Sequence, residues 1–361
     1  MQRPSGRLGG RLGHPAAALL LAALGIAWAV ADSAAAATTD TSSSSPVRGD
    51  TRSAAANPVP VPYRVHARSG PLARGRSKIV ELDTAPFPYN GLVPRSNTPF
   101  INVIENGRRG HRTGSGRVYW EDETYNDSQV LLHLPKGFDI RRPGLLIVFF
   151  HGHGAKLADD VYVRQQVPMQ LSASGINAAL IAPQLARNAA DSSAGKFWQP
   201  GAFARFLADA ARQLARLHGN PRSVRSFASM PVVIVAYSGG YLTTAWCVHH
   251  GGIGKRLQGV VLFDALYGEL DTFASWITRR KSAFFVSTYT HSTQARNLQL
   301  QKVLADRHIP FTTELEPRIG PGSVAFLPAP HDADHRGFLT YAWVGDPLKD
   351  LLNRLPRYGR R

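Results

Sequence analysis

Short apolar runs recur along this chain, and they restrict its fold more than any other feature of the sequence. Most are continuous rather than alternating with polar residues. Continuous apolar runs of this length are typical of strands that are covered on both faces, as in a mostly parallel sheet. The sequence predicts seven such strands, at 130–134, 145–150, 178–182, 232–236, 260–263, 283–287 and 324–327.

Helical segments lie between these strands. The clearest is 202–217, where Phe203, Phe206 and Leu214 belong to one apolar stripe. Strands that alternate with helices form βαβ units with right-handed crossovers. The sequence therefore predicts an α/β fold, a mostly parallel central sheet with helices on both faces. The other predicted helices are 160–174, 240–249, 270–278, 293–307 and 347–355.

The beginning of the chain has the order of segments that directs export. A segment with three arginines is followed by an uncharged run at 16–31 and by four alanines at 34–37. This order is typical of a secretory signal peptide, which we expect to span residues 1–37. An uncleaved membrane anchor is the alternative, but the apolar run is shorter than the roughly 20 residues of a spanning helix. We expect an exported protein, periplasmic or secreted.

Composition divides the rest of the chain into two parts. Residues 38–78 are rich in Ser, Ala, Pro and Arg and have few large apolar side chains, so we expect a disordered linker. Residues 79–361 are long enough for one catalytic domain. The segment 79–127 receives no assignment. Cys247 is the single cysteine, which excludes an internal disulfide.

The net charge of +17 does not by itself indicate a nucleic-acid partner. Residues 1–78 carry +7 of it and the domain carries +10. A nucleic-acid surface normally clusters its basic residues with stacking aromatics or a known motif, and the sequence has neither. We expect no nucleic-acid partner, and at most a weak electrostatic association with an anionic envelope surface.

The strand at 232–236 leads through Tyr237 into Ser238, and a helical pattern begins immediately afterwards. A serine on so tight a turn projects its hydroxyl from the carboxyl edge of the sheet. Such a turn brings the strand and the helix close together and requires small neighbours. Ala236, Gly239 and Gly240 meet this requirement. An ordinary Ser-Gly-Gly turn after a buried strand is the alternative.

A glycine loop follows the strand at 145–150 and reads His151-Gly152-His153-Gly154. Two histidines separated by one residue can ligate Zn²⁺, but such a site needs further ligands. No second histidine pair lies on a predicted helix. We therefore expect no metal and no cofactor.

The tight turn at Ser238, here called the elbow, and the glycine loop together resemble the α/β-hydrolase superfamily. Ala236 stands in place of the first glycine of its Gly-x-Ser-x-Gly motif. The resemblance covers roughly residues 129–355. It implies that Ser238 is the nucleophile. It also implies an oxyanion hole built from the peptide N–H of Gly239 and that of His153 or Gly154.

The same resemblance implies the order nucleophile, acid, histidine along the chain. Asp264 follows the strand at 260–263, where a buried carboxylate needs a partner, so it is the preferred acid. The more usual acid position in the family follows the next strand, where no carboxylate is present. His335 is the preferred base and His331 the alternate. Weaker alternatives are Glu269 and Asp271 for the acid and His291 for the base.

Four further residues are expected to bind substrate: Tyr237, Tyr241, Lys196 and Trp198. The tyrosines flank Ser238, and the other two lie in a loop after a strand end, where ligands bind in this architecture. A surface lysine and a core tryptophan are the alternatives for that pair. The short interval between 264 and 283 leaves room for one helix, and so for a small lid or none.

The sequence thus predicts an exported serine hydrolase that cleaves an ester or a related acyl bond in a small-molecule or polymer-linked substrate. A peptidase or amidase that acts on envelope material would use the same residues. A non-catalytic binding protein on a hydrolase scaffold is the third interpretation, because fold alone does not establish activity.

Overall fold

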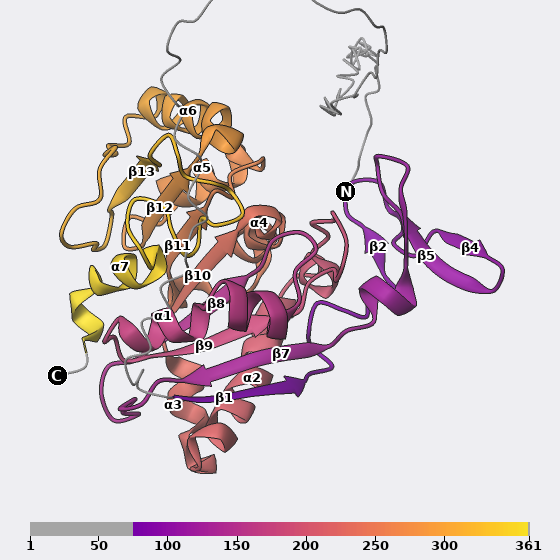
Figure 1. Ribbon diagram of the computed structural model, residues 1–361, viewed down its shortest axis with the longest axis horizontal. Helices are drawn as coiled ribbons and strands as arrows, with labels where there is room; N and C mark the ends of the chain where they lie inside the picture. The colour runs from indigo at the N-terminus through magenta and orange to yellow at the C-terminus, as the bar shows by residue number, and fades with distance from the viewer. Residues whose placement is uncertain (1–74, 360–361) are drawn as a thin grey trace, which may run out of the picture. The chain divides into compact units, whose positions relative to one another are not determined.

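The computed structural model describes residues 75–359, so the expected signal peptide and most of the expected linker lie outside the described residues. An eight-stranded sheet forms the centre of this part of the chain, in the order β1-β7-β9-β8-β10-β11-β12-β13 (Figure 1). β7 is antiparallel to both of its neighbours, and the pairs from β9 onward are parallel. The strands are β1 (Arg76–Glu81), β7 (Gln129–Leu134), β8 (Leu145–Phe150), β9 (Ala178–Pro183), β10 (Val232–Tyr237), β11 (Leu257–Phe263), β12 (Phe284–Tyr289) and β13 (Val324–Pro328).

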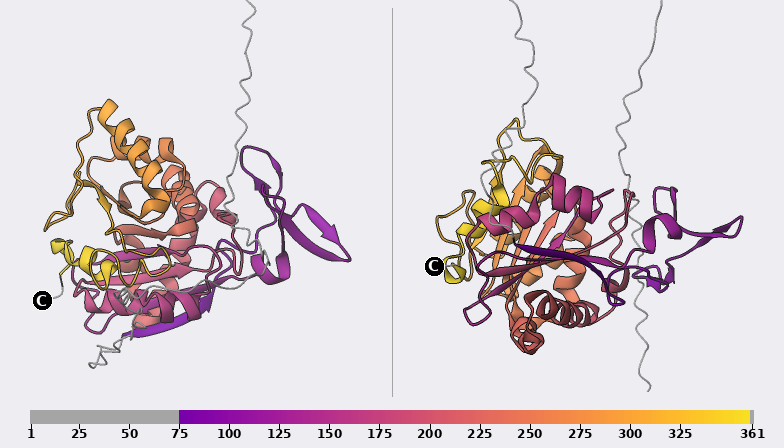
Figure 2. Two further views of the ribbon diagram at one scale, coloured as in Figure 1. Left: turned by 45° about the horizontal axis from the view of Figure 1, so that its top comes forward. Right: turned by 60° about the horizontal axis from the view of Figure 1, so that its bottom comes forward.

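Helices cover both faces of the sheet, and each face has its own apolar core. Figure 2 shows helices on the two sides of the sheet. The fold class predicted from the sequence is therefore confirmed. One core receives side chains of α2 (Ala202–His218), α3 (Val224–Ser229), α4 (Tyr241–His250), α5 (Leu270–Arg279) and α6 (His291–Asp306). The other receives those of η2 (Leu157–Arg164), α1 (Val167–Ala173) and α7 (Pro347–Asn353).

All seven predicted strands are present, because their apolar runs fill both cores. Every residue of β8, β9 and β10 is buried. The edge strand β1 differs, since most of its side chains are exposed and it pairs with β7 mainly through its backbone. It begins at Arg76, so the expected linker extends too far by its last three residues.

The single helix predicted at 160–174 is wrong. The chain forms the π-helical η2 first, and α1 begins at Val167. Gln166 between them has a φ of 53°, a left-handed conformation that cannot continue a helix. Pro168 follows in the first turn of α1, where the missing N–H of proline does no harm.

The unassigned segment before β7 forms two small antiparallel sheets and one helical turn. These are β2 (Leu92–Val93) with β3 (Thr98–Pro99), β4 (Val103–Glu105) with β5 (Arg108–Arg112) and β6 (Val118–Trp120), and η1 (Glu121–Tyr125). Phe87, Phe100 and Tyr125 from this segment are buried in contact with one another. An aromatic cluster therefore anchors the segment to the domain.

Short 3₁₀ turns complete the described part of the chain. They are η3 (Gly195–Trp198), η4 (Pro221–Ser223), η5 (Ser238–Gly240), η6 (Gly254–Arg256) and η7 (Pro356–Tyr358). Only α5 lies between β11 and β12, as the short interval in the sequence predicts. Within residues 75–359, no helix has the length and the apolar character needed to cross a membrane.

Candidate active site

Ser238 lies at the turn between β10 and α4, and its backbone conformation is left-handed. Its φ is 52°, a conformation that costs a non-glycine residue about 1–3 kcal/mol and that recurs at active sites, although it is not confined to them. Gly152 packs against this turn, and a Cβ at that position would lie 2.7 Å from the Ser238 Cβ. The glycine loop after β8 is therefore required for the close approach of its backbone to Ser238.

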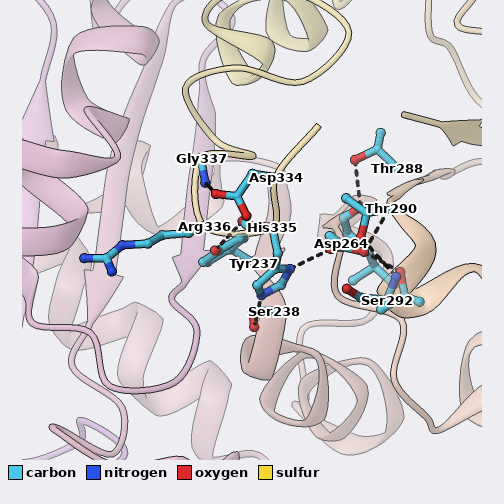
Figure 3. A network of polar contacts seen from close by, with 12 residues as sticks. Tyr237, Ser238, Asp264, Thr288, Thr290, Ser292, Asp334, His335, Arg336 and Gly337 are labelled. Atoms are coloured by element: carbon cyan, nitrogen blue, oxygen red, sulfur yellow. Dashed lines mark hydrogen bonds and ion pairs between the residues drawn. The ribbon is translucent and has the colours of Figure 1, made fainter. Parts of the chain in front are cut away.

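His335 faces Ser238 across the end of the sheet (Figure 3). Its Nε2 lies 2.9 Å from the Ser238 Oγ. The ring of Tyr237 stacks on the imidazole, with 5.2 Å between the ring centroids, and the Tyr237 hydroxyl donates to the His335 carbonyl at 2.7 Å. Burial raises the pKa of Tyr237 to about 12, so this hydroxyl remains a donor at neutral pH. Tyr237 thereby fixes both the ring and the backbone of His335.

Asp264 lies at the carboxyl end of β11, and its side chain is fully buried. His335 Nδ1 donates to its Oδ2 at 2.6 Å, and the Thr290 hydroxyl donates to the same oxygen at 2.7 Å. Oδ1 accepts from the Thr290 N–H and from the Thr293 hydroxyl. Burial would raise the pKa of this carboxyl, but the hydrogen bonds from His335, Thr293 and Thr290 outweigh it and the pKa is lowered. Asp264 is therefore ionised at neutral pH.

These contacts determine which nitrogen of His335 carries the proton. An ionised Asp264 only accepts, so His335 Nδ1 must donate to it, and Nε2 is left with a lone pair facing the Ser238 hydroxyl. This is the arrangement in which an imidazole can remove the proton of a serine as it attacks.

The alternative acids and bases lie elsewhere. His331 and His291 line a separate hollow beside α6. Glu269 pairs with Arg95 at 3.0 Å, and Asp271 lies on α5. The structure therefore brings together Ser238, Asp264 and His335, and none of the alternates.

One of the two alternative peptide donors in the glycine loop is already engaged. The N–H of Gly154 donates to the Ala189 carbonyl at 2.8 Å and is not available to a substrate, so the expectation for Gly154 is wrong. His153 is the remaining candidate in the loop, beside Gly239 in the elbow. The two residues are close, because a Cβ on Gly239 would lie 2.3 Å from Cδ2 of the His153 ring.

His153 has a hydroxyl partner that the sequence does not reveal. Its Nε2 lies 2.7 Å from the Ser192 Oγ. Burial lowers the pKa of His153, and the nearby His335 adds to this effect while Asp191 opposes it. His153 is therefore a neutral imidazole beside the nucleophile at neutral pH.

His151 is buried. Its Nδ1 donates to the Gly152 carbonyl at 2.8 Å, and its Nε2 accepts from the Leu185 N–H at 2.8 Å, with the Gln184 amide at the same distance. Burial lowers its pKa to about 4. His151 and His153 thus use their nitrogens separately, and no cluster of metal-ligating side chains occurs among residues 75–359.

A cavity of about 670 Å³ opens over Ser238. Tyr237 and Tyr241, which the sequence predicts at its rim, belong to its lining. Ser192 comes from the loop after a strand end that the sequence also predicts at the site. Four other side chains of the lining were missed, and only Arg336 offered a signal in the sequence, its position next to His335. The lining comprises His153, Gly154, Asp160, Arg164, Ser192, Tyr237, Ser238, Gly239, Tyr241, Tyr267, His335 and Arg336.

Trp198 and Lys196 do not reach this cavity, which corrects the prediction for both. Trp198 is buried in the core, where its ring meets Tyr89 and Phe100 edge-on at 5.5 Å. The Lys196 ammonium donates to the Asp83 carbonyl at 2.6 Å. Both side chains therefore attach the segment before β7 to the domain.

No protein-family model matches the chain, and no curated protein matches it. Solved structures do resemble it. A mutant of the feruloyl esterase module from Clostridium thermocellum, complexed with sinapinate, has a TM-score of 0.42 and 16% identity, over 75% of this chain and 96% of that one. An S-formylglutathione hydrolase from Agrobacterium tumefaciens has a TM-score of 0.39 and 10% identity, over 71% and 98%. A dienelactone hydrolase from Anabaena variabilis has a TM-score of 0.36 and 14% identity, over 64% and 92%.

Proposed function

We propose that this chain is a serine hydrolase that cleaves carboxylic esters. The observation that carries the proposal is the continuous series of hydrogen bonds from Ser238 through His335 to Asp264, at the floor of an open cavity. Three separate segments of the chain contribute to it. The left-handed backbone at Ser238 adds a local strain that is typical of a reactive position.

In the proposed reaction, Ser238 Oγ attacks the ester carbonyl carbon while its proton passes to His335 Nε2. The peptide N–H groups of Gly239 and His153 stabilise the negative charge that develops on the carbonyl oxygen. The alcohol leaves with the proton from His335. Water then attacks the acyl-enzyme, gives a proton to the same nitrogen, and the carboxylic acid is released as Ser238 recovers its proton. Asp264 keeps His335 in the required tautomer throughout.

A fluorophosphonate probe, which reacts only with an activated serine, tests the nucleophile. The wild-type protein should be labelled, and the Ser238→Ala variant should not. Ser192→Ala is the matched control, because Ser192 also lies 2.7 Å from an imidazole nitrogen in the same cavity. The Ser192→Ala variant should still be labelled. Within residues 75–359 no ion pair joins His153 to a carboxylate, so we do not expect His153 to activate Ser192. A folded wild-type protein that remains unlabelled would contradict the mechanism and favour a binding protein.

Ester and amide hydrolysis share this machinery, so substrates must separate them. The proposal expects 4-nitrophenyl esters to be cleaved with much higher kcat/KM than the 4-nitroanilides of the same acids. A preference for the anilides, or for peptides, would establish the peptidase or amidase alternative instead.

We also propose that the chain is exported, on the basis of the order of segments in residues 1–37. The positive charge of the chain supports a weak association with anionic envelope polymers or lipids. Mass spectrometry of the N-terminus of protein isolated from outside the cytoplasm tests export. A mature protein that begins near residue 38 is expected, and an intact N-terminus on cytoplasmic protein would contradict it.

A further inference from the structure

We propose that the ester carries a carboxylate, which Arg164 and Arg336 recognise at the wall of the cavity. This inference rests on the proposed function and names the substrate class of the same site. Both arginines line the cavity with Ser238 and His335. Figure 3 shows the Arg336 side chain extending from its loop on the side of His335 away from Asp264.

Arg164 is held in place by neighbours that use only part of its guanidinium. Its Nε donates to Asp160 Oδ1 at 2.7 Å, and its Nη1 donates to the Arg336 carbonyl at 3.0 Å. A guanidinium has five N–H donors, so others remain for a ligand. Asp160 is fixed in turn by the Lys156 N–H at 2.8 Å. The position of Arg164 is therefore built into the fold rather than chosen on binding.

Arg336 follows the proposed base directly and is exposed. No ion pair between residues 75 and 359 involves its guanidinium. Its backbone is nevertheless fixed on both sides, because its carbonyl accepts from Arg164 and the preceding carbonyl accepts from the Tyr237 hydroxyl. The fixed backbone therefore holds the root of the Arg336 side chain beside the cavity.

The charged groups of the cavity lining favour a monoanion. The lining itself holds two guanidinium groups and one carboxylate, that of Asp160, which is one positive charge in excess. The ionised Asp264 lies outside the lining, where it is paired with His335. Asp334 is near but outside the lining, and its Oδ2 accepts from the Gly337 N–H. A carboxylate carries the single negative charge that balances this excess, whereas a phosphate monoester carries more. The planar fork of arginine also matches a carboxylate with two parallel hydrogen bonds.

Two pairs of esters test the proposal. Mono-4-nitrophenyl adipate and 4-nitrophenyl hexanoate have acyl chains of equal length, one ending in a carboxylate and one in a methyl group. The ions 5-acetoxypentanoate and neutral pentyl acetate place the same difference on the alcohol side. The measured quantity is the ratio of kcat/KM for the anionic ester to that for the neutral one, after subtraction of the uncatalysed rate.

We expect the wild-type ratio to favour the anionic ester in one of the two pairs, which then identifies the side of the ester that carries the carboxylate. This ratio should fall roughly tenfold in Arg336→Gln and in Arg164→Gln, and should also fall as salt screens the charges. Arg222→Gln, at an exposed arginine of η4 outside the cavity, should keep the wild-type ratio. Equal ratios in the wild type and both cavity variants, in both pairs, would overturn the proposal.

A binding measurement keeps the two proposals separate. If no ester is hydrolysed, the proposed function fails, and ligand-observed NMR with Ser238→Ala still tests recognition. Monomethyl adipate should bind this variant, and adding Arg336→Gln should weaken binding roughly tenfold. Equal binding of monomethyl adipate to the single and double variants, or tighter binding of methyl hexanoate, would refute recognition of the carboxylate by itself.

Discussion

Lowering the pH tests the environment of His151, a histidine that lies beside the proposed nucleophile without taking part in its reaction. The imidazole is buried with its Nδ1–H on the Gly152 carbonyl, and its Nε2 accepts the Leu185 N–H. A proton on Nε2 would face that N–H donor and the amide of Gln184. The folded state therefore favours the neutral ring, and its pKa is lowered to about 4 by burial.

The sign and size of the effect follow from this shift. An unfolded histidine has a pKa near 6.5, so between about pH 6.5 and pH 4 the unfolded chain binds a proton that the folded protein excludes. Stability is complete above this range and is lost as the pH falls through it. At pH 5 the loss relative to pH 7.5 is about 2 kcal/mol, and it approaches about 3 kcal/mol below pH 4.

Urea unfolding followed by fluorescence at pH 7.5 and pH 5 measures this loss in the wild type and in His151→Gln. Glutamine does not titrate, so the variant should lose about 2 kcal/mol less than the wild type over this range. Other titrating groups are common to both proteins and cancel. His308→Gln, at an exposed histidine, should follow the wild type. Parallel pH profiles for His151→Gln and the wild type would refute the argument.

Three further predictions concern the site and the core around it. Asp264→Asn should lower kcat roughly 10⁴-fold, because an amide donor at that position stabilises the wrong tautomer of His335; a loss below tenfold would contradict this role. Trp198→Ala should lower the free energy of unfolding in urea by about 3–5 kcal/mol, and a change below about 1 kcal/mol would place the ring outside the core. Gly152→Ala should slow fluorophosphonate labelling, because its Cβ displaces Ser238, and an unchanged rate would contradict the close approach.

The sheet and the proposed triad could be predicted because both depend on local patterns. The apolar runs of β8 and β10 are readable since every residue in them is buried. Ser238 follows such a run directly, and Asp264 ends another. The structure also brings His335 to Ser238, as its place after the last strand predicts.

Features that depend on distant contacts could not be predicted. The burial of Trp198 comes from Tyr89 and Phe100, roughly a hundred residues earlier in the chain. β1 carries no apolar pattern because most of its side chains are exposed and its pairing with β7 is mainly through the backbone. Arg164 reaches the cavity from η2, and its amphipathic surroundings resemble any exposed helical arginine.

Thr290 brings a second strand end to the place where the Asp264 carboxylate meets His335. It follows the end of β12, next to the strand end that carries Asp264, and its hydroxyl lies 2.7 Å from the Asp264 oxygen that His335 contacts. A carboxylate side chain at position 290 would therefore lie within about one hydrogen-bond length of the oxygen to which His335 Nδ1 donates. Two substitutions, one at each strand end, would transfer the acid between neighbouring strands while the histidine and the nucleophile stay where they are. What such a site requires is a carboxylate at one position beside the histidine, and a residue at the end of either strand could place it there.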